Sequence, residues 1–178
     1  MANMKKHLFL EVEWLSTIKL SATEQRELKV WLNLASEVLE DLIHKNKLIK
    51  STPKKVIVSL LVCGDGRIKK LNRDFRQKDK ITDVLSFPTY ENLRSSKIND
   101  DELFLGDLAI CYQQTKRQAK DFSIGFWDEF IHLFFHGLIH LMGYDHEISI
   151  KEEKMMESWE KKALTLMSKK NGARRPHS

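Results

Sequence analysis

Residues 126–146 read FWDEFIHLFFHGLIHLMGYDH, and this stretch decides how the chain folds. From Phe126 to Met142 it forms the longest apolar segment of the sequence, and its length predicts a helix over 126–142. The segment carries three histidines and a glutamate, so it is too short and too polar to span a bilayer. Gly143 follows where a left-handed residue commonly ends a helix. We therefore expect a central helix that ends in a turn.

Two histidines of this helix are spaced to bind one metal ion. His136 and His140 stand at positions i and i+4, so their side chains lie on one face of the helix. After Gly143 the chain can turn back and bring His146 to the same point. The pattern H-x-x-x-H-x-x-G-x-x-H has the spacing of metzincin hydrolases, and three protein ligands leave one position for water, as in catalytic zinc sites. It predicts one Zn²⁺ per chain, bound by His136, His140 and His146.

A fourth histidine, His132, lies one turn before His136. His132 and His140 are about 12 Å apart along a helix axis, whereas a Zn–N bond is about 2 Å long, so both cannot bind the same ion. We therefore expect His132 either to hydrogen-bond to a group that supports the metal ligands or to line the cleft.

The residue after the first histidine of the pattern is Gly137, where zinc peptidases carry the glutamate that serves as general base. A glycine cannot accept a proton, so a peptidase would need its base from elsewhere. Asp145 and Glu147 flank the third histidine and are the available carboxylates. Asp145 is equally a candidate for the base and for a carboxylate that supports the ligands, whereas Glu147 is better explained as a capping or supporting residue. The missing glutamate argues against proteolysis.

The rest of the chain reads as strands and helices that are partly segregated. Ser21 and Glu24 form a capping-box pair ahead of a helix that extends to about Lys45. A turn at 64–66 precedes a short helix with three apolar residues on one face: Ile68, Leu71 and Phe75. The expected strands are 7–13, 55–63, 83–90 and 103–112, and the expected later helices are 113–121, 126–142 and 149–168. This order predicts an α+β domain with a small mixed sheet of about four strands, about five to six helices, and the zinc site on a central helix.

The composition is that of one soluble domain. The chain has 178 residues, of which 42% are hydrophobic and 31% are charged. We expect one hydrolase domain over 1–168, followed by a basic flexible tail over 169–178. The formal net charge of +5 permits an anionic partner such as RNA, although part of the excess lies in that tail.

The two cysteines and the N-terminus indicate where the protein works. Cys63 and Cys111 form no CxxC pair and no disulfide framework, which is typical of a reducing compartment and predicts no disulfide partner. The apolar run near the N-terminus is interrupted by Glu11 and Glu13 and makes a poor signal peptide. We therefore expect a cytoplasmic protein with no membrane partner.

Three segments resemble, in order, the sequence patterns of the YbeY family of bacterial endoribonucleases: LNRDFRQKDKITDVLSFP at 71–88, LGDLAIC at 105–111 and HGLIHLMGYDH at 136–146. The resemblance covers roughly residues 55 to 165. Two positions depart from the family patterns. Ile81 stands where the family usually has proline, and Cys111 stands where it usually has serine, which removes a hydroxyl near the expected cleft.

The resemblance implies a single-strand-specific, metal-dependent ribonuclease that acts on rRNA in maturation and ribosome quality control, with the ribosome or its small subunit as partner. It also implies that the three histidines are zinc ligands and that Arg76 is the functional arginine. A guanidinium can contact two phosphate oxygens and stabilise charge as the phosphorus becomes five-coordinate. Lys78 and Arg73 can bind flanking phosphates, while Asp83 and Ser86 either orient the loop and substrate or hold a turn.

Two other functions stay open. The histidine spacing alone fits a metal-dependent peptidase or another hydrolase. From a different class, the chain fits a ribosome-associated binding factor in which zinc is structural. Gly137 argues against the first alternative, and chelation tests the second, because removing a structural ion unfolds the protein.

Overall fold

The computed structural model describes residues 9–51, 53–91, 93–95, 98–145 and 148–174. Within these residues one sheet contains four strands, in the order β1 (Phe9–Ser16), β2 (Lys55–Cys63), β4 (Glu102–Cys111) and β3 (Val84–Pro88). β1, β2 and β4 run parallel to one another, and β3 runs antiparallel to β4 at one edge. This sheet and the helices packed on it confirm the predicted α+β class.

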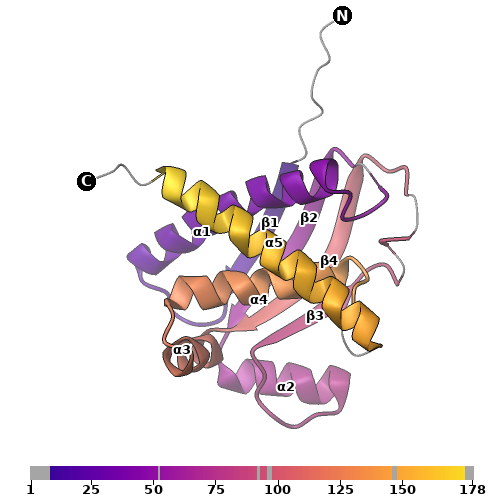
Figure 1. The fold of residues 1–178 in the computed structure, drawn as a ribbon. Coiled ribbons are helices and arrows are strands. Elements are labelled where there is room, and N and C mark those ends of the chain that lie inside the picture. The colour runs from indigo at the N-terminus through magenta and orange to yellow at the C-terminus, as the bar shows by residue number, and fades with distance from the viewer. Residues whose placement is uncertain (1–8, 52, 92, 96–97, 146–147, 175–178) are drawn as a thin grey trace, which may run out of the picture.

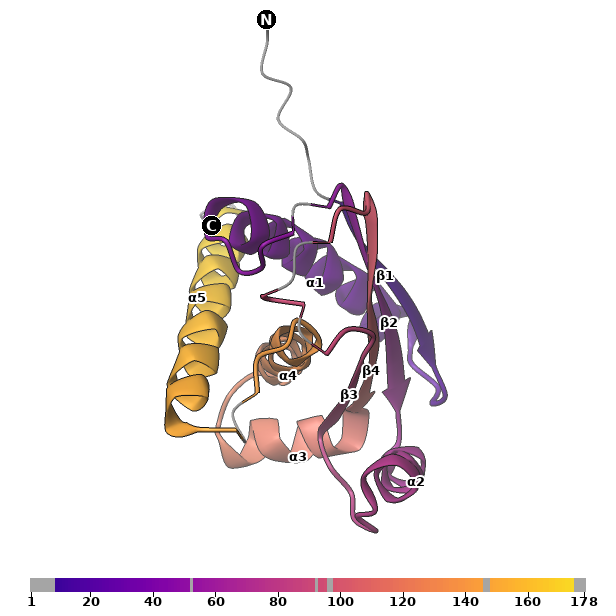
Figure 2. The ribbon, with the colours of Figure 1, turned by 90° about the vertical axis from the view of Figure 1, so that its right-hand side faces the viewer.

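Helices form two layers on one face of this sheet (Figure 1 and Figure 2). α1 (Ala22–Glu40), continued by the π-helical turn η1 (Asp41–Lys45), packs on β1, and α4 (Phe126–Leu141) packs on β3 and β4. α5 (Ile150–Arg174) covers α1 and α4 from outside. Because α4 lies between the sheet and α5, it is apolar on nearly every side.

Side chains of α4 fill the space between these layers. Phe130, Phe134 and Phe135 are all fully buried, and each contributes roughly 1.5–3 kcal/mol through burial. Gly137 faces the sheet, where a Cβ atom would lie 2.7 Å from Cδ2 of Leu108 in β4. The glycine thus lets the helix approach the sheet closely. No helix among the described residues is long and apolar enough to cross a membrane.

The opposite face of the sheet carries α2 (Asp65–Arg76), and α3 (Tyr112–Asp121) follows directly on β4 (Figure 2). Beneath α2, Cys63 and Cys111 are register partners on β2 and β4, and both are free thiols, as predicted. Burial raises the pKa of Cys63 to about 12 and that of Cys111 to about 11, so both stay protonated at neutral pH. Phe75, expected on the buried face of α2, is instead 65% exposed and packs edge-on against Phe87.

The start of α1 follows the predicted capping box. The backbone N–H of Ser21 donates to the Glu24 carboxylate at 2.8 Å, and the N–H of Glu24 donates to the Ser21 hydroxyl at 3.2 Å. The Tyr112 hydroxyl also donates to Glu24, and this hydrogen bond is the main reason that the pKa of Glu24 falls to about 2. The capping box therefore also joins α1 to α3.

The end of α5 differs from our expectation. We expected the helix to stop at about 168 and a flexible tail to follow, but α5 continues to Arg174. Nζ of Lys170 lies 3.7 Å from Glu37 and 3.4 Å from Asp41, which belong to α1 and η1. These ion pairs give the basic segment a partner surface, which local sequence signals could not reveal.

A β-bulge in β4 shapes the edge of the sheet beside β3. The register between β2 and β4 shifts between Ile57 and Val58, where β4 contains one additional residue, Leu105. Gly106 follows with a φ of 133°, a conformation that other residues rarely adopt. A Cβ atom there would lie 2.1 Å from the backbone oxygen of Phe87 in β3. The bulge therefore requires glycine.

Replacing Gly106 with alanine should lower the free energy of unfolding by about 3 kcal/mol, because the new Cβ meets the backbone of β3 at a strained φ. Thermal unfolding should show a Tm lower by roughly 6–12 °C. Gly66→Ala is the matched control, since a Cβ on this residue of α2 meets nothing within 4 Å, and its Tm should stay the same or rise slightly. Equal Tm values for both variants would contradict this account of the bulge.

Candidate active site

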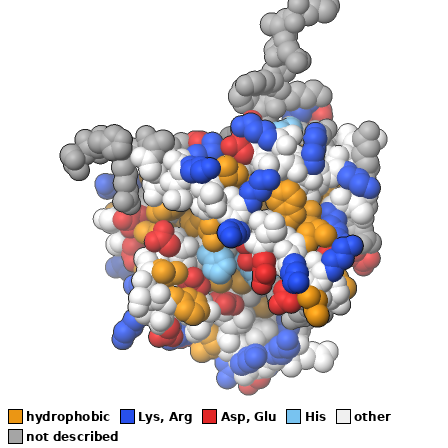
Figure 3. Space-filling model, in the orientation of Figure 1, with side chains coloured by type: hydrophobic (Ala, Val, Ile, Leu, Met, Phe, Trp, Pro, Cys, Tyr) orange, Lys and Arg blue, Asp and Glu red, His pale blue; other side chains and the backbone are white. Residues whose placement is uncertain are grey.

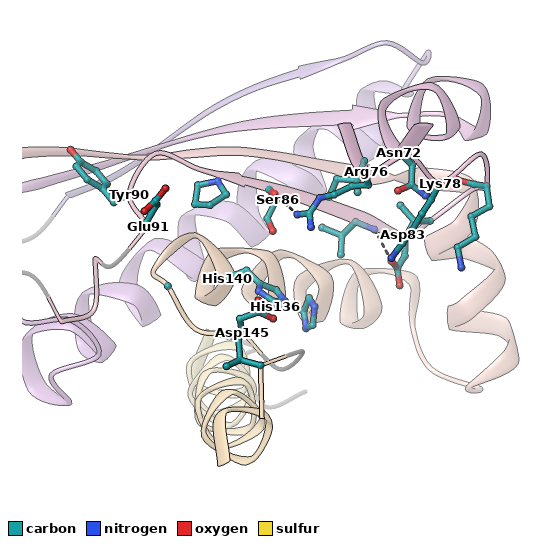
Figure 4. A pocket seen from close by; sticks show the side chains of 17 residues that line it. Asn72, Arg76, Lys78, Asp83, Ser86, Tyr90, Glu91, His136, His140 and Asp145 are labelled. Atoms are coloured by element: carbon teal, nitrogen blue, oxygen red, sulfur yellow. Dashed lines mark hydrogen bonds between the residues drawn. The ribbon is translucent and has the colours of Figure 1, made fainter. Parts of the chain in front are cut away.

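A groove of about 620 Å³ lies between α4 and the edge strand β3 (Figure 4). α4 forms one wall, and β3 with the loop after α2 forms the other. The groove brings together seven of the residues that were given candidate roles from the sequence: Arg76, Lys78, Asp83, Ser86, His136, His140 and Asp145. Two others, Arg73 and His132, do not line it. Residues from distant parts of the sequence therefore meet at one place.

His136 and His140 lie next to each other on the α4 wall. Their ring centres are 4.8 Å apart and the ring planes are inclined by 74°. Two imidazoles bound to one tetrahedral zinc ion would have ring centres roughly 5 Å apart, given Zn–N bonds of about 2 Å. The pair therefore fits two ligands of one tetrahedral ion.

The turn after α4 leads the chain along the groove. Gly143 has a φ of 89°, as predicted for the residue that ends the helix. Asp145 lines the groove, while His146 and Glu147 lie outside the described residues. Among the described side chains, no group of three or more His, Cys, Asp or Glu residues is arranged to hold a metal ion. His146 as third ligand therefore remains a prediction.

A glutamate that the sequence analysis missed contacts His136 from behind the groove wall. Oε1 of Glu160, in α5, lies 2.8 Å from Nδ1 of His136. A carboxylate at Nδ1 assigns metal binding to Nε2 and makes the ring a better ligand. One signal could have identified Glu160: it shares a face of α5 with the buried residues Met156 and Ala163.

Charge at Glu160 is stabilised by two histidines. Burial raises the pKa of Glu160, but hydrogen bonds with His132 and His136 outweigh burial and lower it to about 2. The carboxylate is therefore ionised at neutral pH. The same hydrogen bond with Glu160 is the main cause of the raised pKa of His132. His132 thus contacts the carboxylate that supports His136, and it does not line the groove.

Arg76 is the last residue of α2 and reaches the groove from the side of the sheet (Figure 4). Its Nη2 donates to the carbonyl of Ser86 in β3 at 3.1 Å, which anchors the guanidinium at the sheet edge. Gln77 follows with a φ of 57° and ends the helix. Within the described part of α2, other basic side chains form ion pairs, but no such pair involves Arg76. Its charge is therefore available to a phosphate.

The loop after α2 is fastened by Asn72, a buried residue that the sequence analysis gave no role. Its Nδ2 donates to the carbonyl of Lys80 at 2.9 Å, and its own carbonyl accepts from the N–H of Lys78 at 3.2 Å. Both lysines line the groove. Ile81, where proline is usual in the family patterns, is exposed. Hydrogen bonds to Asn72 thus hold this loop in shape without the proline ring.

Arg73, expected to bind a flanking phosphate, faces acidic neighbours instead. Its Nε lies 3.5 Å from Asp74 and its Nη1 lies 3.7 Å from Asp79. Across the face of the molecule in Figure 3, basic and acidic side chains are likewise interspersed, and the basic ones do not gather into one patch. Positive charge in the groove therefore comes from a few specific residues.

Asp83 and Cys111, two further positions from the resemblance, have structural contacts. The carboxylate of Asp83 accepts from the N–H of Val84 at 2.7 Å and from the amide of Gln118 at 2.8 Å, which ties the start of β3 to α3. These contacts fit the turn-holding role, while Asp83 and Ser86 also line the groove, so a role in orienting the loop or substrate stays a prediction. Cys111, expected near the cleft, lies beneath α2, where its thiol donates to Asp65 at 3.2 Å. Cys111 does not line the groove, because it lies on the α2 side of the sheet.

Comparisons with known proteins show which family the chain resembles. Residues 19–168 match the family model described as "Endoribonuclease YbeY". The "Endoribonuclease YbeY" of Thermodesulfovibrio yellowstonii is 38% identical over 120 residues, which cover 67% of this chain and 72% of that protein. The protein of the same name from Aquifex aeolicus is 40% identical over 114 residues, which cover 64% of this chain and 72% of that protein.

A solved structure is similar over nearly the whole chain. The solution structure of TM1509 from Thermotoga maritima matches with a TM-score of 0.58 at 26% sequence identity, covering 92% of this chain and 93% of that one. The family model spans 150 residues, from 19 to 168, which include all of the groove-lining residues named above. The chain therefore belongs to the YbeY endoribonuclease family.

Proposed function

We propose that this protein is a zinc-dependent endoribonuclease that cleaves single-stranded RNA, with one Zn²⁺ held by His136, His140 and His146. One observation carries the proposal: two histidines of α4 and the guanidinium of Arg76 face the same groove from opposite walls. A metal next to an arginine is a combination suited to phosphodiester chemistry, in which negative charge develops on phosphate oxygens. The family to which the chain belongs supports the same reaction.

A phosphodiester in the groove would meet positive charge that is already in place. Arg76, held by the Ser86 carbonyl, can contact two phosphate oxygens and stabilise the charge that grows on them. Lys78 and Lys80 extend this positive charge along the loop and can bind neighbouring phosphates. When bound, zinc supplies a Lewis acid for the same phosphate. Asp145 lines the groove together with two other carboxylates, Asp83 and Glu91, and we assign it either to take up a proton or to hold a metal ligand.

The cellular role we propose is rRNA maturation and ribosome quality control in the cytoplasm, with the ribosome or its small subunit as partner. Support comes from the family resemblance and from the net charge of +5, which favours association with RNA. Cofractionation of the protein with ribosomal subunits tests this role. Recovery of the protein only in fractions free of ribosomes would count against it.

A metal-dependent peptidase is the competing enzyme. Its general base would follow the first histidine, but position 137 faces β4, and a side chain there would meet Leu108. A glutamate at 137 would therefore point into the sheet and away from the groove. Purified protein assayed in parallel on single-stranded RNA and on an unstructured peptide separates the two activities.

A ribosome-binding factor with structural zinc is the alternative from a different class. α4 is held in place by the sheet and α5, so we expect the fold to survive when the metal is removed. Circular dichroism before and after treatment with a chelator measures this. Unfolding on chelation would favour a structural ion, whereas loss of RNA cleavage with the fold intact would favour a catalytic one.

Replacing Arg76 with glutamate should lower the rate of RNA cleavage by about 100-fold or more, because the glutamate would repel the negative charge that develops on the phosphate. Zinc content should stay at the wild-type level. Arg67→Glu makes the same charge change on an exposed residue of the same helix outside the groove, and it should retain most activity. Single-turnover cleavage of a single-stranded RNA measures both variants. Wild-type rates for Arg76→Glu would remove Arg76 from the mechanism.

Replacing His140 with alanine should prevent stoichiometric zinc binding, since two imidazoles leave a catalytic site one ligand short. His146→Ala should have the same effect and directly tests the proposed third ligand. His177→Ala removes a histidine outside the motif and is the control. Elemental analysis of each purified variant gives zinc per chain. Full zinc occupancy in His140→Ala would refute the assignment of the metal site.

A further inference from the structure

Four of the five polar residues of α4 form a single stripe, and the fifth, Asp128, lies in its first turn. Glu129, His132, His136 and His140 follow one another at spacings of three, four and four residues, which places them along one side of the helix. Apart from Asp128, the rest of the helix is apolar and packed against the sheet and other helices. Only the C-terminal end of the stripe, at His136 and His140, lines the groove.

A series of contacts between carboxylates and imidazoles links the other end of the stripe to the groove. Oε1 of Glu160 lies 2.8 Å from Nδ1 of His136, and its Oε2 lies 3.8 Å from Nε2 of His132. Nδ1 of His132 in turn lies 3.5 Å from Oε2 of Glu129. Each oxygen of Glu160 therefore faces a different histidine, and His132 lies between two carboxylates.

The two carboxylates of this series are largely withdrawn from solvent, whereas the His132 side chain between them is 40% exposed. The side chain of Glu129 is 3% exposed and that of Glu160 is 15% exposed. A carboxylate in such a place is costly unless it is paired, and apolar replacements for buried ion pairs are often neutral or stabilising. Stability alone therefore does not account for two carboxylates between α4 and α5.

We propose that Glu160, His132 and Glu129 are a positioning network that holds the His136 ring ready to bind the metal. Glu160 acts directly, because its carboxylate accepts the Nδ1 hydrogen of His136 and so assigns Nε2 to the metal. His132 holds the second oxygen of Glu160, and Glu129 holds His132 from the buried side. The proposal rests on the proposed function, because it gives His136 a metal to bind.

The network also explains why α5 belongs to the site. Glu160 is supplied by α5, whereas both histidines belong to α4, so ring orientation depends on how the two helices are packed. A metal ligand that is already oriented loses less conformational freedom on binding. Supporting carboxylates of this kind typically change metal affinity by 10–100-fold when they are removed.

The first test determines which nitrogen of the His136 ring carries the hydrogen in the metal-free protein. Long-range ¹H–¹⁵N NMR spectra at mildly alkaline pH report which ring nitrogen carries the hydrogen. We expect Nδ1–H for His136 in the wild type and in Glu160→Gln, whose amide oxygen can still accept, and a mixture of both forms in Glu160→Ala. Glu157→Ala, an exposed glutamate of the same helix, should match the wild type. Identical His136 signals in the wild type and Glu160→Ala would overturn the proposal.

The second test measures zinc affinity by competition with a chromophoric chelator. Glu160→Ala should bind zinc about 10–100-fold more weakly than the wild type, Glu160→Gln should fall between them, and Glu157→Ala should match the wild type. His132→Ala should lose less zinc affinity than Glu160→Ala. Far-UV circular dichroism confirms folding, and Glu160→Gln still decides the question if Glu160→Ala does not fold.

The two tests separate this proposal from the function on which it rests. Wild-type zinc affinity in both Glu160 variants would overturn the network while leaving the metal site intact. A wild type that binds no zinc would overturn the metal site. In that case the NMR spectra still show whether Glu160 fixes the ring of His136.

Discussion

Enclosure of α4 between the sheet and α5 is the constraint on which the site depends. A helix covered on two sides has few positions that reach solvent, so its histidines enter the groove only near its C-terminal end. For the same reason, groups that contact these histidines from behind must come from the covering helix, as Glu160 does. Packing of large apolar residues such as Phe134 thus determines where the polar residues lie.

Local signals predicted much of this architecture. The capping box at Ser21 and the left-handed residue Gly143 involve neighbours within a few residues, and the four strands follow from their composition. The contact between His136 and Glu160 was not predictable in this way, because it depends on how α4 and α5 pack. The predicted end of α5, at about 168, was wrong for a similar reason, since the contacts of its last turns lie on α1 and η1.

Net charge was a poor guide to the residues that face a substrate. Arg73 and Arg76 are three residues apart on the same helix, yet only Arg76 crosses the edge of β3 and reaches the groove. Arg73 is held by acidic neighbours, which reduce its effect on an approaching phosphate. The overall charge of +5 includes both kinds of residue equally. What separates them is the placement of α2 against the sheet, which is a property of tertiary structure.

The close approach of Gly137 to Leu108 also limits how this scaffold can diversify during evolution. A zinc peptidase carries its base one residue after the first histidine, but here a side chain at that position would point at the sheet and meet the Leu108 side chain. A substitution at this position alone would therefore require Leu108 to move and would still not direct a base into the groove, even though the metal-ligand spacing is shared. New activities would have to arise on the opposite wall, where the loop after α2 can change its residues without disturbing the core.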